Sequence, residues 1–333
     1  MTYIAKFAHP DHPDMFAGVV LASRPTNCAL PILSVHARYP RIIHSEVMTH
    51  RKFSRNARSS RAVPVKTMLN EIRNNPFVPW HWGANQKGMQ AGEDCNELVE
   101  FTRIVRVADG FTIAPGKWSR EAGWLHQRDH AAEMAEAYMN AGYHKQIPNR
   151  LLEPFAWMDT LITSTSWANF KHLRVHKDAE PHFQDLAALV EQALDHVKVF
   201  DLYQPLDTGQ WHLPYITPDD YRIVLDYLRN GVKINPTPER QVEVLKKISA
   251  ARCARISYTP FDGDGSFERE MERYQILISS DRLHASPTEH QATPDEGITN
   301  GKSVNWLYPD LAGNLGSGWI QFRKTLPGEY VAD

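Results

Sequence analysis

The sequence predicts a mixed fold of the α/β or α+β class. Helical patterns alternate with short strand-like runs along the chain, as they do in both classes. The chain has 333 residues, of which 42% are hydrophobic and 23% charged, enough for one large domain or two ordinary ones. No sequence repeat of about 20 to 50 residues is visible, so a solenoid or a propeller is not expected.

The first third of the chain predicts a strand, a helix and a long irregular stretch. Residues 30–35 predict a short strand, and Pro31 within them favours the edge of a sheet. Apolar residues at helical spacing predict a helix over residues 39–53. Residues 54–116 show little periodicity and contain the cluster Trp80-His81-Trp82. Such a stretch predicts either a lid over a stacked ligand or a buried aromatic loop.

The middle of the chain predicts three helices. The first covers residues 119–141 and ends before Gly142, and the second covers residues 164–174. The third begins at Pro181, because proline is favoured at the first position of a helix. Its apolar residues have the spacing of one buried helix face: Phe183, Leu186, Val190, Leu194 and Val197.

The last third begins with residues 201–236, whose prolines predict a connector. A helix is expected from Thr237, with Val242, Leu245 and Ile248 along one face. Further elements are expected in this order: a strand over 254–258, a helix over 266–281 and a strand-like edge with cations over 319–324.

Composition limits the classes of partner. Lys plus Arg number 37 and Asp plus Glu number 39, which gives a net charge of −2. This balance excludes a whole-chain basic surface for nucleic acid or anionic membranes. No apolar run long enough for a membrane span or a signal peptide occurs. The three cysteines are far apart, as in a protein of a reducing compartment, and we expect a cytoplasmic protein without a metal site.

A basic stretch over residues 49–61 is the most informative part of the sequence. From charge alone it fits a solvated helix face, or a patch that contacts nucleic-acid phosphates. Ser59 and Arg61 form a hydroxyl and guanidinium pair that suits a phosphate monoester. His50 and Arg51 lie one helical turn beyond Glu46 and Val47, so we expect them to face the same cavity as the loop that follows them.

The same stretch resembles the signature of the flavin-dependent thymidylate synthases (ThyX), RHR-x7-S within RHRxxSxNExSxR. Six positions match the signature: His50, Arg51, Ser54, Asn56, Ser59 and Arg61. Thr49 replaces the first arginine of the signature and Ala57 replaces its glutamate. Arg323 and Lys324 are candidates to restore the positive charge that is lost at Thr49.

Two later segments resemble the same family. Residues 149–154 (NRLLEP) resemble its AR-x-x-LP motif, whose arginine binds the nucleotide phosphate, and this implies that role for Arg150. Residues 169–174 (NFKHLR) resemble its N-F-x-x-L-R helix. That resemblance implies that Asn169 contacts flavin and that Arg174 contacts the pyrimidine ring. Residues 163–165 (TST) depart from the Asn-x-Arg that opens this helix in the family.

A part of the sequence that resembles the N-terminal half of this family lies near the C-terminus. Residues 250–258 contain AAR and ISY, as in AARxSY, and residues 284–290 (HASPTEH) resemble HxSPxEH. This order implies a circular permutation. Folds often tolerate such a change, because chain termini often lie close together. We therefore expect residues 1–200 and 237–333, joined by the connector 201–236, to form one catalytic domain. The proposal requires residues 284–290 to fold beside residues 50–61.

The tail motif also has a purely structural interpretation. Ser286, with Pro287 after it and Glu289 three positions on, has the pattern of a helix capping box. Capping and binding are compatible, because a helix N-terminus attracts anions such as a flavin diphosphate.

The resemblance implies a central, mostly antiparallel sheet flanked by helices, and a homotetramer with sites between subunits. It implies reductive methylation of dUMP at C5, with FAD as cofactor and methylenetetrahydrofolate and NADPH as co-substrates. Arg174 is the expected catalytic residue. The expected substrate-binding residues are Glu46, Ser59, Arg61, Arg150 and Arg174. The expected cofactor-binding residues are His50, Arg51, Asn169, His284, Ser286, Glu289 and His290.

Three alternatives stay open at this point. One is a related flavin enzyme that modifies another pyrimidine nucleotide, such as dCMP, or that hydroxymethylates its base. Another is a nucleic-acid-binding module that uses residues 51–61, and the third is a non-catalytic relative kept for assembly. A mechanism in which a cysteine thiolate attacks the pyrimidine ring is not favoured, because no cysteine has a sequence setting typical of a nucleophile. The many arginines favour the flavin route, in which cations polarise the base.

Overall fold

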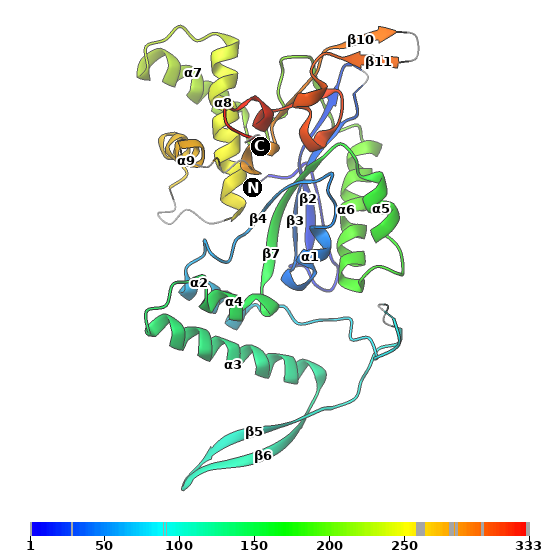
Figure 1. Cartoon of the computed structure of the whole chain (residues 1–333), viewed down its shortest axis with the longest axis vertical. Helices are drawn as coiled ribbons and strands as arrows, with labels where there is room; N and C mark the ends of the chain where they lie inside the picture. Colours follow the sequence, from blue (N-terminus) through cyan, green and yellow to red (C-terminus); the bar gives the residue numbers. More distant parts are fainter. Residues whose placement is uncertain are drawn as a thin grey trace.

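The computed structural model describes residues 2–27, 29–88, 90, 92–257, 264–279, 283, 286–300 and 303–330, with the backbone alone for 103–107 and 111–114. It confirms a mixed α/β architecture built on antiparallel pairing. A central sheet has helices on both sides, and a separate helical layer with a long hairpin lies below it (Figure 1).

The central sheet has the strand order β1-β2-β3-β7-β4, and a short β8 pairs with β2. Every pair is antiparallel except β2 with β8. The strands are β1 (Ala5–Ala8), β2 (Phe16–Pro25), β3 (Ile32–Pro40), β4 (Ser54–Ala57), β7 (Trp157–Ser164) and β8 (Gln204–Leu206). The predicted edge position of the strand near Pro31 is wrong, since β3 lies between β2 and β7. Pro31 precedes the first strand residue, so its missing N–H removes no ladder hydrogen bond.

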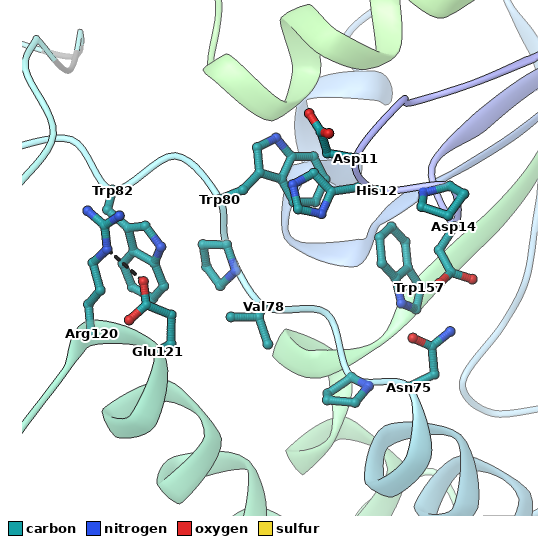
Figure 2. Close-up of a pocket in the computed structure, with 13 residues that line it drawn as sticks. Asp11, His12, Asp14, Asn75, Val78, Trp80, Trp82, Arg120, Glu121 and Trp157 are labelled. Atoms are coloured by element: carbon teal, nitrogen blue, oxygen red, sulfur yellow. Dashed lines mark hydrogen bonds and ion pairs between the residues drawn. The ribbon is translucent and has the colours of Figure 1, made fainter.

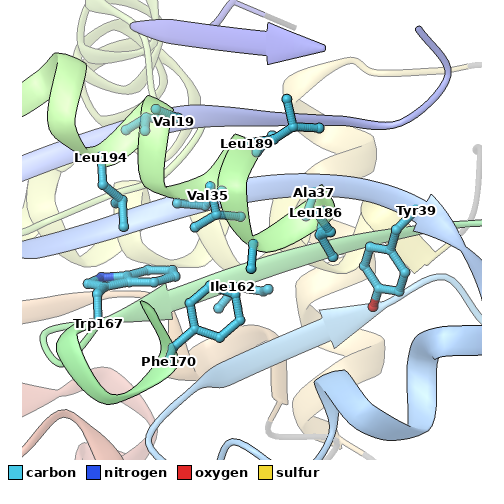
Figure 3. Packing of buried hydrophobic residues seen from close by; sticks show 14 of the residues in the cluster. Val19, Val35, Ala37, Tyr39, Ile162, Trp167, Phe170, Leu186, Leu189 and Leu194 are labelled. Atoms are coloured by element: carbon cyan, nitrogen blue, oxygen red, sulfur yellow. The ribbon is translucent and has the colours of Figure 1, made fainter. Parts of the chain in front are cut away.

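The main core lies between this sheet and helix α6 (Pro181–Val199), with α5 (Ala168–Arg174) beside it. The predicted start of α6 is confirmed, because Pro181 is its first residue and the Glu180 side chain accepts a hydrogen bond from the Phe183 N–H. The predicted apolar stripe is buried along its full length. Figure 3 shows Leu186, Leu189 and Leu194 packed over Val35 and Ile162 of the sheet. Each buried aliphatic side chain contributes about 1.5–3 kcal/mol to folding.

The other side of the sheet is covered by the C-terminal part of the chain. The helices there are α7 (Pro218–Asp226), the π-helical turn η3 (Tyr227–Gly231), α8 (Pro238–Ala254) and α9 (Phe267–Ser279). Residues 201–236, predicted as a connector, contain β8, α7 and η3. The predicted strand over 254–258 is wrong: α8 continues to Ala254 and a 3-10 turn, η4 (Arg255–Ser257), follows, because the small apolar residues pack as a helix face. Tyr258 lies outside the described residues.

A second layer contains α2 (Val65–Asn74), α3 (Arg120–Asn140), α4 (Pro148–Leu151) and the 3-10 turn η2 (Glu153–Phe155), with a core of its own. The helix predicted over 119–141 is confirmed: Ser119 caps α3, and Gly142 follows it with a φ of 86°, which glycine adopts without steric cost. The hairpin β5 (Val99–Val107) and β6 (Gly110–Trp118) projects from this layer (Figure 1).

Residues 54–116 are thus not an irregular stretch, since they contain β4, α2, β5 and most of β6. The helix predicted over 39–53 is shorter than expected: β3 runs to Pro40, and only η1 (Arg41–Ile43) and α1 (His44–Val47) follow. The helix predicted over 164–174 begins at Ala168, because Ser164 is the last residue of the buried strand β7 and residues 165–167 connect the strand to the helix.

The C-terminal region is built from short elements. Two small hairpin-like pairs join β9 (Ala292–Pro294) to β12 (Trp319–Gln321) and β10 (Gly297–Asn300) to β11 (Ser303–Trp306). The 3-10 turns are η5 (Ser286–Glu289), η6 (Pro309–Leu311), η7 (Gly313–Leu315) and η8 (Phe322–Thr325). The strand expected over 319–324 is therefore half strand and half 3-10 turn. The helix expected to reach residue 281 is described as far as Ser279.

Candidate functional site

A cavity of about 280 Å³ lies between the turn after α1 and the exposed side of α5. Four of the residues selected from the sequence line it, and they come from two distant segments. Its walls are formed by Thr49, His50, Arg51, Lys52, Phe53, Ser166, Asn169, Phe170, Leu173 and Arg174. The structure therefore brings together the predicted flavin-binding residues His50, Arg51 and Asn169 and the predicted catalytic Arg174.

Arg174 and His50 form the polar centre of this cavity. The Arg174 Nε–H donates to His50 Nε2 at 3.0 Å, and its terminal N–H donates to the Thr49 hydroxyl at 3.1 Å. The guanidinium lies 4.9 Å from the centre of the Phe183 ring, within the range of a cation–π contact. Burial and the nearby charges of Arg174 and Arg55 lower the pKa of His50 to about 4. His50 is therefore neutral at pH 7, and because Nε2 accepts, its proton is assigned to Nδ1.

Arg55 holds the turn that carries His50 in place. Its guanidinium donates to three main-chain carbonyls at the end of α1, those of Val47, Met48 and His50, at 3.4, 2.7 and 3.2 Å. Cations bind helix C-terminal carbonyls favourably, since the helix dipole is negative there. Sequence reasoning missed Arg55, although an arginine shortly after a predicted helix end is the signal that points to such a clamp.

The basic stretch 49–61 contains half-buried cations with internal partners and exposed cations. Arg58 is committed to a two-point ion pair with Glu71 of α2, at 2.7 and 2.8 Å. Arg55 is committed to the carbonyls described above, whereas Arg51, Lys52 and Arg61 are exposed. The stretch is therefore not one continuous surface of free charge.

The predicted phosphate-binding residues lie in a different part of the fold. Ser59 and Arg61 follow β4, and Arg150 is exposed on α4. The buried Asn149 amide joins these segments by donating to the carbonyls of Ser60 and Val63 at 2.6 and 2.8 Å. None of these residues lines the His50 cavity.

Glu46 lies on α1, where its carboxylate accepts a hydrogen bond from the Ser45 hydroxyl at 2.9 Å. Its main-chain carbonyl accepts one from the Thr49 hydroxyl at 2.7 Å, and Thr49 in turn accepts from Arg174. Glu46 is therefore linked to the cavity through Thr49, without lining it.

Residues 286–290 of the C-terminal region lie beside the basic stretch, as the proposed circular permutation requires. Ser286 donates its hydroxyl proton to Asn56 Oδ1 at 3.3 Å, and Asn56 donates to the Cys253 carbonyl at 2.7 Å. Gln321 donates to Ser54 and to the Glu289 carbonyl, at 3.2 and 2.9 Å. These contacts place η5 next to β4 in the same chain, but η5 does not line the His50 cavity. His284 lies outside the described residues.

Residues 286–289, predicted to carry a helix capping box, form a single 3-10 turn. Within the described part of the chain, the Ser286 hydroxyl donates to Asn56 and the Glu289 carboxylate pairs with Arg323. Burial raises the pKa of Glu289, which its ion pair with Arg323 opposes. Arg323 and Lys324 both pair with Glu329, so the cation beside Thr49 is Arg174 and not either of these.

His290 belongs to a chain of hydrogen bonds inside the protein. It is fully buried, and its Nδ1 lies 2.8 Å from the Thr163 hydroxyl. Thr163 contacts the Ser34 hydroxyl at 2.6 Å, and Ser34 contacts His212 Nε2 at 2.9 Å. His212 Nδ1 contacts the Ser23 hydroxyl at 2.8 Å. Burial lowers the pKa of His290 and of His212 to about 3 each, and the nearby His290 adds to the effect on His212.

The described residues contain no group of three or more His, Cys, Asp or Glu side chains arranged to bind a metal ion. In the same part of the chain, no helix combines the length and the apolar character needed to cross a bilayer. Comparison of the chain with models of known protein families and with curated protein sequences finds no match.

Proposed function

We propose that this chain is a flavin-dependent enzyme that methylates a pyrimidine nucleotide, with dUMP as substrate. One observation carries the proposal. His50, Arg51, Asn169 and Arg174 were selected from two separate sequence motifs for flavin and pyrimidine binding, and all four line one cavity. The neighbourhood of β4 and η5 adds support, because a permuted relative of the ThyX family requires that contact.

The residues of the cavity fit part of a flavin. Arg51 and Lys52 are exposed cations at its rim and suit the phosphates, and His50 Nδ1–H is a neutral donor. Phe53 and Phe170 offer apolar ring surface. A volume of about 280 Å³ suits a single ring system rather than a whole dinucleotide. When bound, FAD would supply the reducing equivalents for methylation, with NADPH as their source and methylenetetrahydrofolate as the carbon donor.

Arg174 is suited to stabilise negative charge on a pyrimidine ring. Two of its five N–H donors are used by His50 and Thr49, and the other three have no protein acceptor within the described part of the chain. A guanidinium that is already oriented by Phe183 and His50 needs little rearrangement to meet a developing charge. Burial raises the pKa of the Cys253 thiol far above its usual value, so Cys253 is not an available thiolate nucleophile.

Ser59, Arg61 and Arg150 would bind the substrate phosphate. Because they do not line the His50 cavity, a complete site requires a second copy of the chain, as in the homotetramers that the resemblance implies. By the same resemblance, His284, Ser286 and Glu289 would form the other flavin-binding wall. The expected cofactor role of His290 is wrong, because its side chain is fully buried and bonded to Thr163 inside the protein. We place the enzyme in the cytoplasm, where nucleotide substrates and NADPH are available.

A related activity on another pyrimidine, such as dCMP or a hydroxymethylated base, is the second candidate. It is favoured by Ala57, which stands where the family signature has a glutamate. A nucleic-acid-binding role has less support, because Arg55 and Arg58 of the basic stretch are committed to internal partners.

The deciding experiment reconstitutes the purified protein with FAD and follows its visible spectrum. The proposal expects a flavin spectrum that NADPH bleaches, and turnover of dUMP with methylenetetrahydrofolate. Preference for dCMP would select the second candidate. Arg174→Ala should abolish turnover while leaving flavin binding and folding intact, whereas Arg222→Ala, an exposed arginine of α7, should change neither. A colourless protein that does not take up FAD, or an active Arg174→Ala enzyme, would refute the assignment.

A further inference from the structure

A second, larger cavity lies away from the His50 cavity and has no part in the proposed function. Its volume is about 460 Å³, within the usual range for ligand sites. It is formed by the loop at residues 11–14, the segment at residues 75–82, the start of α3 and the start of β7. Figure 2 shows Trp80, Trp82 and Trp157 around it, with Val78 and two prolines along the connecting segment.

Each of the three indole rings in this cavity already lies against a planar nitrogen-containing group of the chain itself. The His12 ring stacks on Trp80 with 4.1 Å between ring centres and an interplanar angle of 14°. The Arg120 guanidinium lies 5.6 Å from the Trp82 ring, and the Arg38 guanidinium lies 6.0 Å from Trp157. These contacts indicate that the indole faces favour flat groups rich in N–H donors.

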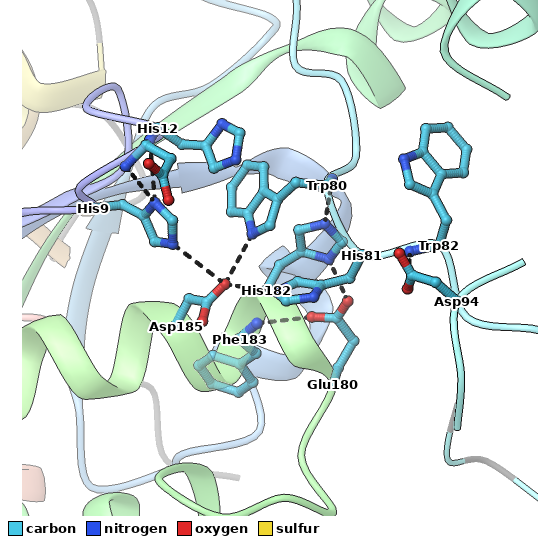
Figure 4. A network of polar contacts seen from close by, with 11 residues as sticks. His9, His12, Trp80, His81, Trp82, Asp94, Glu180, His182, Phe183 and Asp185 are labelled. Atoms are coloured by element: carbon cyan, nitrogen blue, oxygen red, sulfur yellow. Dashed lines mark hydrogen bonds and ion pairs between the residues drawn. The ribbon is translucent and has the colours of Figure 1, made fainter. Parts of the chain in front are cut away.

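Trp80 is held in a fixed orientation by a polar network beneath the cavity. Its indole N–H donates to the Asp185 carboxylate at 2.9 Å, and the same oxygen lies 2.8 Å from His81 Nε2. Its main-chain N–H donates to His182, whose other nitrogen binds Glu180 at 2.7 Å (Figure 4). A ring oriented in advance in this way loses little conformational entropy when a ligand stacks on it.

The cavity walls are also negatively charged. The lining contains three carboxylates, those of Asp11, Asp14 and Glu121, and one guanidinium, that of Arg120. Arg38 does not line the cavity, but its guanidinium lies 4.0 Å from the Asp14 carboxylate. The Arg120 guanidinium is already paired with Glu121 at 2.8 Å and with Asp94 at 3.3 Å. Burial and the neighbouring His9 lower the pKa of His12, so this ring is neutral at pH 7 and does not repel a cation.

We propose that this cavity binds a guanidinium group. A guanidinium is flat enough to stack on Trp80 in place of the His12 ring, or on Trp82 in place of the Arg120 guanidinium. Its charge matches the carboxylates of Asp11 and Asp14. Its forked N–H donors suit a carboxylate better than a compact ammonium does. The group belongs either to a free small molecule or to an arginyl side chain, and the experiment below separates these sources.

The test labels the protein with 5-fluorotryptophan and records the fluorine spectrum during titration. The chain has 9 tryptophans, and single Trp→Phe variants assign the three that line the cavity. Ethylguanidinium should shift these three resonances with a Kd of about 1–10 mM, as expected for a fragment of this size. Ethylammonium, which is charged but not flat, and ethylurea, which is flat but uncharged, should each bind at least tenfold more weakly. Equal binding of ethylurea, or no shift of the three resonances, would overturn the proposal.

The charge requirement is tested by the double substitution Asp11→Asn and Asp14→Asn, which should weaken ethylguanidinium binding at least tenfold. The matched control is Asp109→Asn with Asp310→Asn, two exposed carboxylates outside the cavity, which should leave the Kd unchanged. Unchanged affinity in the first variant, with native circular dichroism, contradicts the inference. Comparing agmatine with acetyl-Gly-Arg-Gly-amide then tells a small-molecule ligand from an arginyl side chain by which binds more tightly.

Discussion

The buried His290 makes the stability of the fold dependent on pH, and His290→Gln isolates its contribution. His290 is fully buried with its Nδ1 bonded to Thr163, and burial lowers its pKa to about 3. In the unfolded chain the same imidazole titrates near its ordinary pKa of about 6.5. Between these values the unfolded chain binds the proton and the folded protein does not. Stability is therefore fully present above pH 6.5 and is lost as the pH falls below it.

The size of the effect follows from the two pKa values. Going from pH 7.5 to pH 5.0, a histidine with a pKa of about 3 in the fold and about 6.5 in the unfolded chain costs about 2 kcal/mol of unfolding free energy. The neutral amide of His290→Gln does not titrate, so the variant lacks this loss. The pKa of His212 is lowered chiefly by its own burial, which the variant retains, so His212 contributes nearly the same loss to both proteins. Titrating groups far from His290 contribute equally to both and cancel in the comparison.

The assay is urea unfolding followed by circular dichroism, for both proteins at both pH values. The wild type should lose about 2 kcal/mol more than His290→Gln between pH 7.5 and pH 5.0. The variant is expected to be less stable at pH 7.5, because it disturbs a buried network, but this offset does not affect the difference. An equal loss in both proteins would show that His290 titrates normally in the fold and would refute the reasoning.

Three further substitutions test other parts of the structure. Arg55→Met should weaken FAD binding at least tenfold in a spectroscopic titration, because the carbonyls of Val47, Met48 and His50 lose their hydrogen-bond donor. An unchanged Kd would contradict the role of Arg55 in holding His50 in place. Asn149→Ala should lower the free energy of unfolding by about 1–3 kcal/mol in urea, since two buried carbonyls lose their partner. Leu186→Ala should cost about 2–5 kcal/mol in the same assay, and a loss below 1 kcal/mol would argue against tight packing of α6 on the sheet.

Much of the helical structure was predictable because its signals are local. Pro181 and the stripe that follows it define α6, and Ser119 and Gly142 define the ends of α3. The strands were harder, because their pairing is not local. The residues of β7 carry a buried run that pattern alone does not separate from a helix, and the sheet around them decides the outcome.

Sequence motifs predicted residues that line the candidate site, but they did not predict the residues that hold those side chains in position. His50, Arg51, Asn169 and Arg174 were selected from motifs, and the structure places them around one cavity. The clamp formed by Arg55 depends on the position of three carbonyls, which no residue pattern specifies. For the same reason, no residue pattern predicts that His290 bonds Thr163 inside the protein and does not face a cofactor.

The hydrogen-bond chain from Ser23 to His290 couples two imidazole rings across three strands of the sheet. If His212 donates through Nε2, the Ser34 hydroxyl must donate its hydrogen bond to Thr163, and the Thr163 hydroxyl must donate to His290 Nδ1. His290 then carries its proton on Nε2, and reversing any one bond reverses all of them. The two rings thus behave as a single unit with two opposite polarities, and a change at one end is transmitted to the other without any movement of the backbone.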